Sequence, residues 1–192
     1  MKYILVAILW ILPVIASGNI SDPHNGTNLY RIVELTIKHL KGRYKHPVQY
    51  NIDWNIRLLD ETEIAKRWCG AYGSENSVQY IECMGRDRVE AYYEVSTGTI
   101  ILKKSLSLDD PYDVGSIIHE VVHFVQDRHG LTSRGRRSKC RAWLEYEATL
   151  IEKELVQQLD IHIPDWYKDH WHKWLKHWAS KLDDNGNCVT QQ

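Results

Sequence analysis

Residues 110–130 read DPYDVGSIIHEVVHFVQDRHG, and this stretch decides the fold. Asp110 suits a helix N-cap, Pro111 suits the first turn, and Gly130 marks a helix end. Between these signals the apolar residues recur at helical spacing: Val114, Ile117, Ile118, Val121, Val122 and Val125. The sequence therefore predicts an amphipathic helix whose apolar face packs into a core.

The opposite face of this helix carries an HExxH motif, formed by His119, Glu120 and His123. Residues four apart lie one above the other on a helix, so both imidazoles can bind one metal ion. Zinc lowers the pKa of a bound water to ~7, and an adjacent carboxylate can accept its proton. We therefore expect His119 and His123 to be zinc ligands and Glu120 to be the general base.

A zinc site of this kind needs a third protein ligand, for which there are three candidates. His129 is the eleventh residue of the motif, but Gln126 stands where a chain reversal would need Gly, so we expect His129 to end the helix. Glu145 follows Arg141 by four residues, as in an ordinary solvated ion pair. Glu147 has only apolar helical neighbours, where a carboxylate is costly unless it is paired or binds metal. We predict Glu147 as third ligand, with His129 and Glu145 as alternatives.

On these residues the chain resembles the HExxH zincin peptidases, and among them the gluzincin-like kind, in which a glutamate on the following helix completes the site. The resemblance runs from about residue 92 to 159 and implies His119, His123 and Glu147 as ligands, Glu120 as base, and a peptide or protein substrate. It also implies that the edge strand of the 92–102 hairpin holds the substrate backbone. The chain departs from the thermolysin-like pattern, because Leu144 rather than Asn precedes Glu145.

Outside this region the pattern predicts an α+β domain. We expect a helix over 28–40, a strand over 48–58, a short helix over 60–68, and a hairpin of strands 89–95 and 99–102. The expected fold is a small antiparallel sheet packed on the motif helix, with a support helix after it. The tail is rich in Trp and His, and a helical face of Tyr167, Trp171, Trp174 and Trp178 predicts a helix that covers the core.

The N-terminus has the order of a signal peptide: Lys2, an apolar run to Ile15, then small residues to Gly18. The run is shorter than the ~20 residues that span a membrane. We therefore predict a signal peptide over 1–18, one zincin-like domain over 19–192, a secreted or extracytoplasmic location, and no stable membrane insertion after cleavage.

Four cysteines fit an exported protein, in which thiols oxidise in pairs. Three pairings are possible, and we prefer Cys69 with Cys83 and Cys140 with Cys188. Lys and Arg total 24 and Asp and Glu total 25, a balance that argues against nucleic-acid binding. A basic loop between the two metal-bearing helices is either a solvated connector or a rim that favours acidic substrates: Arg128, Arg134, Arg136, Arg137 and Lys139.

These patterns predict a secreted zinc-dependent peptidase. A donor to the developing oxyanion is expected among Tyr146, Tyr167, His170 and His172. The alternative is a catalytically silent binding or adhesion module that retains a structural metal. Glu120 favours the enzyme, because a structural zinc site needs ligands but no base.

Overall fold

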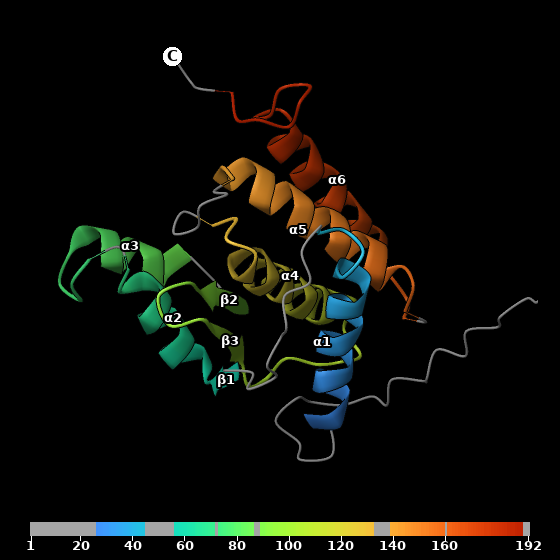
Figure 1. Cartoon of the computed structure of the whole chain (residues 1–192). Helices are drawn as coiled ribbons and strands as arrows, with labels where there is room; N and C mark the ends of the chain where they lie inside the picture. The colour runs from blue at the N-terminus through green and yellow to red at the C-terminus, as the bar shows by residue number, and fades with distance from the viewer. Residues whose placement is uncertain are drawn as a thin grey trace, which may run out of the picture.

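The computed structural model describes residues 26–44, 56–71, 73–86, 89–132, 139–159 and 161–189. Within these ranges it contains six helices and three strands (Figure 1): α1 (Gly26–Leu40), β1 (Ile56–Leu59), α2 (Glu61–Cys69), α3 (Val78–Arg86), β2 (Ala91–Glu94), β3 (Thr99–Lys103), α4 (Pro111–Arg128), α5 (Arg141–Val156) and α6 (Asp165–Ala179). This arrangement confirms the α+β class. The predicted signal peptide lies outside the described residues.

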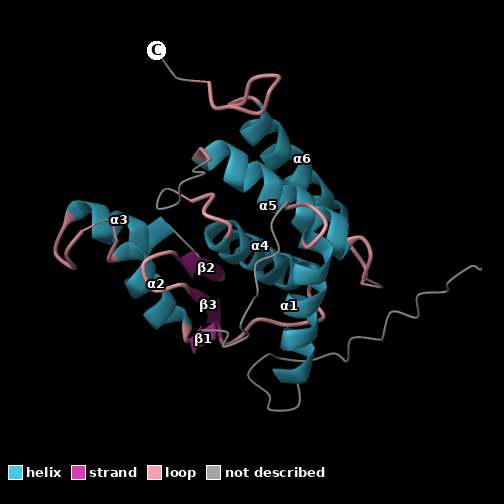
Figure 2. Ribbon diagram, viewed as in Figure 1, coloured by secondary structure: helices cyan, strands magenta, loops and turns pink. Residues whose placement is uncertain are grey.

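Helix α4 is the centre of the fold and lies between the sheet and helices α1 and α5 (Figure 2). Asp110 caps its first turn by accepting a hydrogen bond from the backbone N–H of Tyr112 at 2.8 Å. The helix ends at Arg128, and Gly130 then adopts a φ of 69°, which glycine tolerates best. All six predicted core residues of this helix are buried, so the apolar stripe is confirmed: Val114, Ile117, Ile118, Val121, Val122 and Val125.

The sheet has the strand order β1-β3-β2, with β2 at an edge. The predicted hairpin is confirmed: β2 pairs antiparallel with β3, with Tyr93 opposite Ile100. The expectation of a purely antiparallel sheet is wrong, because β1 pairs parallel with β3, with Ile56 opposite Ile100. After β1 the chain passes through α2 and α3 to β2 at the far edge of the sheet. It then turns back through the hairpin into β3, which therefore runs in the same direction as β1.

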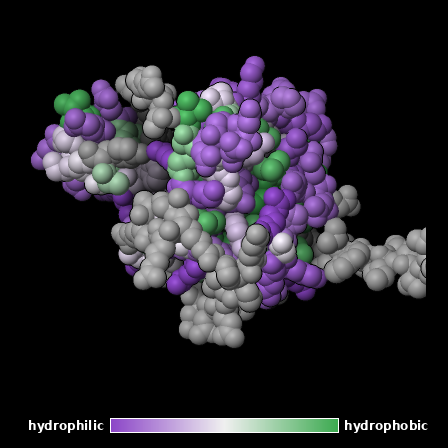
Figure 3. Space-filling view, turned by 45° about the horizontal axis from the view of Figure 1, so that its top comes forward, coloured by the Kyte–Doolittle hydropathy of each residue, from purple (hydrophilic) through white to green (hydrophobic). Residues whose placement is uncertain are grey.

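The connection between β1 and β2 is more helical than expected. The predicted short helix is α2, and Asp60 and Glu63 form a capping box at its start, with the Glu63 N–H donating to the Asp60 carboxylate at 2.8 Å. Helix α3 follows in a region for which the sequence pattern predicts no element, and the disulfide Cys69–Cys83 joins it to α2 across 5.6 Å between Cα atoms. The leftmost hydrophobic patch in Figure 3 lies over α3, where Val78 and Ile81 are exposed.

Helix α5 packs on α4, and α6 packs on α5. The second disulfide joins Cys140, the N-cap of α5, to Cys188 beyond α6, and both preferred pairings are thereby confirmed. Tyr167 and Trp171 of α6 are buried in the core, as predicted, whereas Trp174 is 38% exposed. Among the described helices, none is long and apolar enough to cross a membrane.

Candidate metal centre

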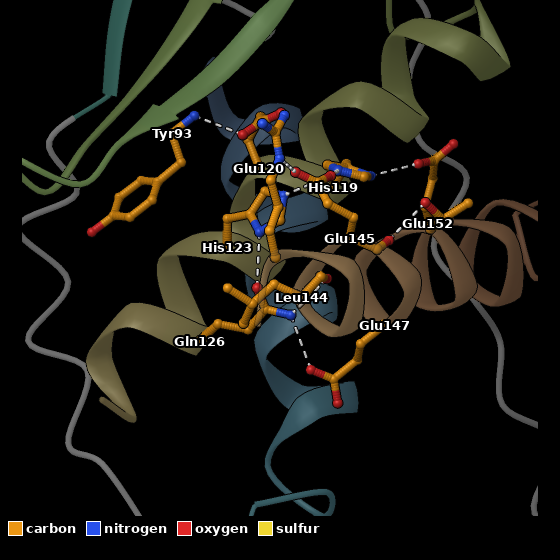
Figure 4. Close-up of polar contacts among 11 residues, drawn as sticks. Tyr93, His119, Glu120, His123, Gln126, Leu144, Glu145, Glu147 and Glu152 are labelled. Atoms are coloured by element: carbon orange, nitrogen blue, oxygen red, sulfur yellow. Dashed lines mark hydrogen bonds and ion pairs between the residues drawn. The ribbon is translucent and has the colours of Figure 1, made fainter. Parts of the chain in front are cut away.

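Two imidazoles of α4 and one carboxylate of α5 converge on the same point (Figure 4). Nε2 of His119 lies 3.3 Å from Oε2 of Glu145, and Nε2 of His123 lies 3.5 Å from the same oxygen. These three possible ligand atoms all lie within 4.8 Å of one another. One ion can therefore be reached by all three side chains after small adjustments.

A buried glutamine fixes the orientation of His123. The side-chain amide of Gln126 donates to the carbonyl of Leu144 and to the carboxylate of Glu147, both at 3.0 Å. Because both partners are acceptors, Oε1 of Gln126 must be the oxygen that faces His123 Nδ1, at 2.8 Å. His123 therefore carries its proton on Nδ1, and its Nε2 presents a lone pair to Glu145 when the ring is neutral.

Glu152 fixes His119 in the same way. Its Oε2 lies 2.9 Å from Nδ1 of His119, while its Oε1 accepts hydrogen bonds from the Tyr167 hydroxyl at 2.8 Å and Trp171 Nε1 at 2.7 Å. Metal-binding histidines are commonly oriented by such a carboxylate on the second ring nitrogen. His119 therefore also directs the lone pair of a neutral Nε2 towards Glu145.

The electrostatics of this cluster favour a positive charge. Burial lowers the pKa of His119, but hydrogen bonds with Glu145 and Glu152 outweigh burial and raise that pKa well above its ordinary value of 6.5. Burial raises the pKa of Glu145, but hydrogen bonds from His119 and His123 outweigh it and lower that pKa. A proton or a metal cation can supply this charge. Two neutral imidazoles and one carboxylate are a donor set that fits zinc.

Glu120 lies beside the cluster and faces the edge of the sheet. Its Oε2 accepts a hydrogen bond of 2.6 Å from the backbone N–H of Tyr93 in β2. The Tyr93 hydroxyl donates in turn to Asp127 of α4 at 2.8 Å. These two contacts attach the edge strand to the helix that carries the motif.

The cluster opens into a cleft of about 620 Å³. Residues 89–93 of β2 and the chain before it line one side, and His170, Trp174 and Trp178 of α6 line the other. His119, Glu120, His123 and Glu145 all contribute to its surface. The Trp-rich helix therefore forms a wall of the cleft and leaves the cluster accessible.

The profile of a family described as Domain of unknown function (DUF6647) matches residues 49–168, more than half of the chain. The chain belongs to the DUF6647 family. No curated protein and no solved structure matches it. The family match includes His119, His123, Glu145 and Glu152 of this DUF6647 chain, whereas Trp171 and the rings of α6 that line the cleft lie beyond it.

The third residue of the cluster differs from the predicted one. The structure brings Glu145 to the two histidines, whereas the carboxylate of Glu147 faces α1 and accepts hydrogen bonds from the Tyr44 hydroxyl at 2.6 Å and from Gln126. The carboxylate of Glu147 does need a partner, as its apolar neighbours indicated, but that partner is a pair of neutral hydrogen-bond donors and not a metal ion. In this structure, Glu145 replaces Glu147 as the candidate third ligand.

The other sequence candidates also have definite places. His129 is the C-cap of α4, and its ring lies 4.4 Å from that of Tyr44, so it is not part of the cluster. Arg141 pairs with Glu145 at 3.5 Å and lines the cleft. In the basic loop, Arg128 lies over Phe124 and Lys139 over Trp143, while residues 133–138 lie outside the described part of the chain.

Sequence reasoning missed Gln126 and Glu152, although both carried a signal. Gln126 occupies the apolar stripe four residues after Val122 and is fully buried. Glu152 has Ala148, Thr149 and Val156 as helical neighbours, so the burial argument used for Glu147 applies to it equally well. A polar residue at a core position of this helix pair was therefore a signal for a residue beside the candidate metal centre.

Proposed function

We propose that this chain is a secreted zinc-dependent peptidase with His119, His123 and Glu145 as ligands and Glu120 as general base. One observation carries the proposal: Nδ1 of each histidine faces an acceptor, and the two Nε2 atoms both face the carboxylate of Glu145. This arrangement needs a proton or a metal cation between the imidazoles and the carboxylate, and the donor set fits zinc. Two disulfides agree with an exported protein.

A set of two histidines and one glutamate is typical of catalytic zinc sites, which keep a fourth position open. Bound there, zinc would act as a Lewis acid that polarises a peptide carbonyl and lowers the pKa of water to ~7. Glu120 accepts a proton from the attacking water while the water oxygen bonds to the peptide carbonyl carbon. It then transfers that proton to the amine nitrogen as the C–N bond breaks.

The outer edge of β2 is consistent with a peptide as the substrate. Tyr93 directs its N–H away from β3 and towards Glu120, and backbone groups alternate along a strand, so Ala91 directs its N–H and C=O to the same side. Ala91 also lines the cleft. An extended peptide can pair with this edge through main-chain hydrogen bonds.

Among the oxyanion donors expected from the sequence, Tyr167 is committed to Glu152 in a buried position, whereas His170 lines the cleft. Burial lowers the pKa of His170 below its ordinary value of 6.5. A neutral His170 can donate one hydrogen bond through a ring N–H. It is therefore the member of the expected group best placed to approach a bound substrate.

The test compares wild type with Glu120→Gln, with Glu34→Gln on the exposed side of α1 as matched control. Zinc content is measured by atomic absorption, and cleavage is measured on casein and a mixed peptide library. We expect all three proteins to bind about one zinc, and Glu120→Gln to lose 10²- to 10⁴-fold in cleavage rate, roughly the contribution of a general base. Zinc binding without cleavage in wild type and Glu34→Gln would favour the silent binding module.

A further inference from the structure

Three aromatic rings form a row along the α6 wall of the cleft. His170, Trp174 and Trp178 follow one another at four-residue intervals. The ring centroids of His170 and Trp174 are 6.0 Å apart, and those of Trp174 and Trp178 are 5.7 Å apart with their planes inclined by only 24°. All three residues line the cleft that contains the candidate metal centre.

This row is not explained by the core of the protein. Tyr167 and Trp171 of the same helix are almost completely buried and hold Glu152, whereas Trp174 is 38% exposed. An exposed tryptophan that faces a cleft presents a large apolar surface to whatever enters it. The sequence prediction that the tail helix covers the core is thus right for Tyr167 and Trp171 and wrong for Trp174.

The opposite wall is also aromatic. Trp68 of α2 and Tyr92 of β2 line the cleft, and their ring centroids lie 5.3 Å apart. The candidate metal centre lies in the same cleft as these two ring groups. A substrate chain bound in the cleft is therefore within reach of aromatic rings from either wall.

Three of the four glutamates that line the cleft are neutralised by contacts within the protein, and the fourth, Glu120, accepts a hydrogen bond from the backbone N–H of Tyr93. Glu90 forms an ion pair with Lys103, Glu145 faces two histidines, and Glu152 is enclosed by three donors. Arg141 is the basic residue among those lining the cleft, and it pairs with Glu145. We therefore do not expect the charges on the cleft walls to favour charged side chains in a bound substrate.

We propose that His170, Trp174 and Trp178 form a subsite that binds large apolar side chains of an extended peptide substrate. The inference rests on the proposed function and names the substrate class. Alternate side chains of an extended chain repeat every ~6.6–6.8 Å, close to the spacing of the rings. Two such side chains can therefore each contact a successive ring of the row.

Binding is measured by calorimetry with the zinc-loaded Glu120→Gln protein, so that no peptide is cleaved. Four blocked hexapeptides alternate alanine with phenylalanine, leucine, glutamate or lysine. We expect the phenylalanine and leucine peptides to bind at least about 10-fold more tightly than the charged ones. Adding Trp174→Ala should reduce the ratio of the affinities for apolar and charged peptides about 10-fold, as expected for one aromatic contact. Trp166→Ala is the matched control, because Trp166 is an exposed tryptophan of the same helix that does not line the cleft.

Equal affinity for all four peptides would overturn the subsite, as would equal losses from Trp174→Ala and Trp166→Ala. Tight binding of a soluble chitin oligosaccharide, with no binding of the peptides, would assign the rings to a glycan instead. Cleavage by the wild type without apolar preference would overturn the subsite and leave the peptidase standing. Apolar-selective binding to a protein that cleaves nothing would support the subsite and contradict the catalytic proposal.

Discussion

His119 and Glu152 form a hydrogen bond between α4 and α5, with His119 Nδ1 2.9 Å from Glu152 Oε2. The carboxylate is almost fully buried and also accepts from Tyr167 and Trp171 of α6. Burial raises the pKa of Glu152, but the hydrogen bonds from His119, Trp171 and Tyr167 and the charge on His119 together outweigh burial and lower that pKa. Three helices therefore meet at one carboxylate that determines how His119 faces the candidate metal centre.

The first prediction concerns Glu152→Gln. A carboxamide has one acceptor oxygen where the carboxylate has two, so at least one of the three donors around it loses its partner. We expect zinc to bind roughly 10- to 100-fold more weakly, measured by competition with a chromophoric chelator. Glu154→Gln is the control, because Glu154 lies on the same helix but pairs with Arg43 near the surface. Equal zinc affinities in both variants would reduce Glu152 to a structural role.

The second prediction separates Glu145 from Glu147. Glu145→Ala removes a proposed ligand, so we expect most of the zinc to be lost after dialysis. Glu147→Ala leaves the Tyr44 hydroxyl and the Gln126 amide without their acceptor, which costs about 1–3 kcal/mol of unfolding free energy but should spare zinc. Metal analysis and urea denaturation of both variants measure these effects. Zinc loss confined to Glu147→Ala would restore the ligand expected from the sequence.

The contrast between α4 and α5 shows what the sequence could predict. The motif helix follows from local patterns, since its caps, its apolar stripe and the side that carries His119 and His123 depend on residues within one segment. Which glutamate becomes the candidate third ligand depends on how α5 is rotated against α4, and that rotation is a property of packing between helices. Hairpin pairing was likewise local, whereas the parallel pairing of β1 with β3 was not.

Small residues at the contact between α5 and α4 explain how α5 is rotated. The helical neighbours of Glu145 include the small residues Ala142, Ala148 and Thr149, which do not mark a core position in the sequence. In the structure Ala142, Ala148 and Thr149 are buried. Small residues let two helices approach closely, and this approach brings Glu145 and Glu152 to His119. A single sequence cannot distinguish a small residue on a surface from one at a close helix contact.

The third prediction uses the ion pair between Arg67 of α2 and Glu94 of β2. Hydrogen bonds from Arg67, at 3.0 and 2.8 Å, outweigh burial and lower the pKa of Glu94 below its ordinary value of 4.5. A carboxyl with a lowered folded pKa stabilises the protein above its unfolded pKa, and this stability is lost as the pH falls through the folded pKa. Because both side chains are partly exposed, Glu94→Gln should cost only about 0.5–1 kcal/mol at pH 7.

Urea denaturation of wild type and Glu94→Gln at several pH values measures this difference. It should be constant from pH 7 to 5 and shrink as the pH falls below 4.5. Glu34→Gln, exposed on α1, should show no comparable trend. A difference that grew on acidification would contradict the assigned sign.

The last prediction concerns Gly115, which lies in α4 beneath Tyr167. A Cβ at this position would lie 1.8 Å from the Tyr167 hydroxyl oxygen and 3.2 Å from Cγ of Glu152. Replacing glycine by alanine inside a helix normally stabilises by about 0.5–1 kcal/mol. Here the added methyl must displace Tyr167 from Glu152, so we expect Gly115→Ala to cost about 1–3 kcal/mol instead. The weakened Glu152 should also lower the affinity for zinc.

Gly85→Ala provides the matched control, because Gly85 is helical and a Cβ there meets no described heavy atom within 4 Å. We expect this variant to be slightly more stable than wild type, because alanine lowers the backbone entropy of the unfolded chain and makes no new clash in the folded one. Urea denaturation and zinc competition on both alanine variants make the comparison direct. Opposite signs of the two stability changes would support the contact between Tyr167 and α4 that holds Glu152 in place. Stabilisation by both substitutions would show that Tyr167 does not pack against Gly115, and the proposed support of His119 through α6 would then be wrong.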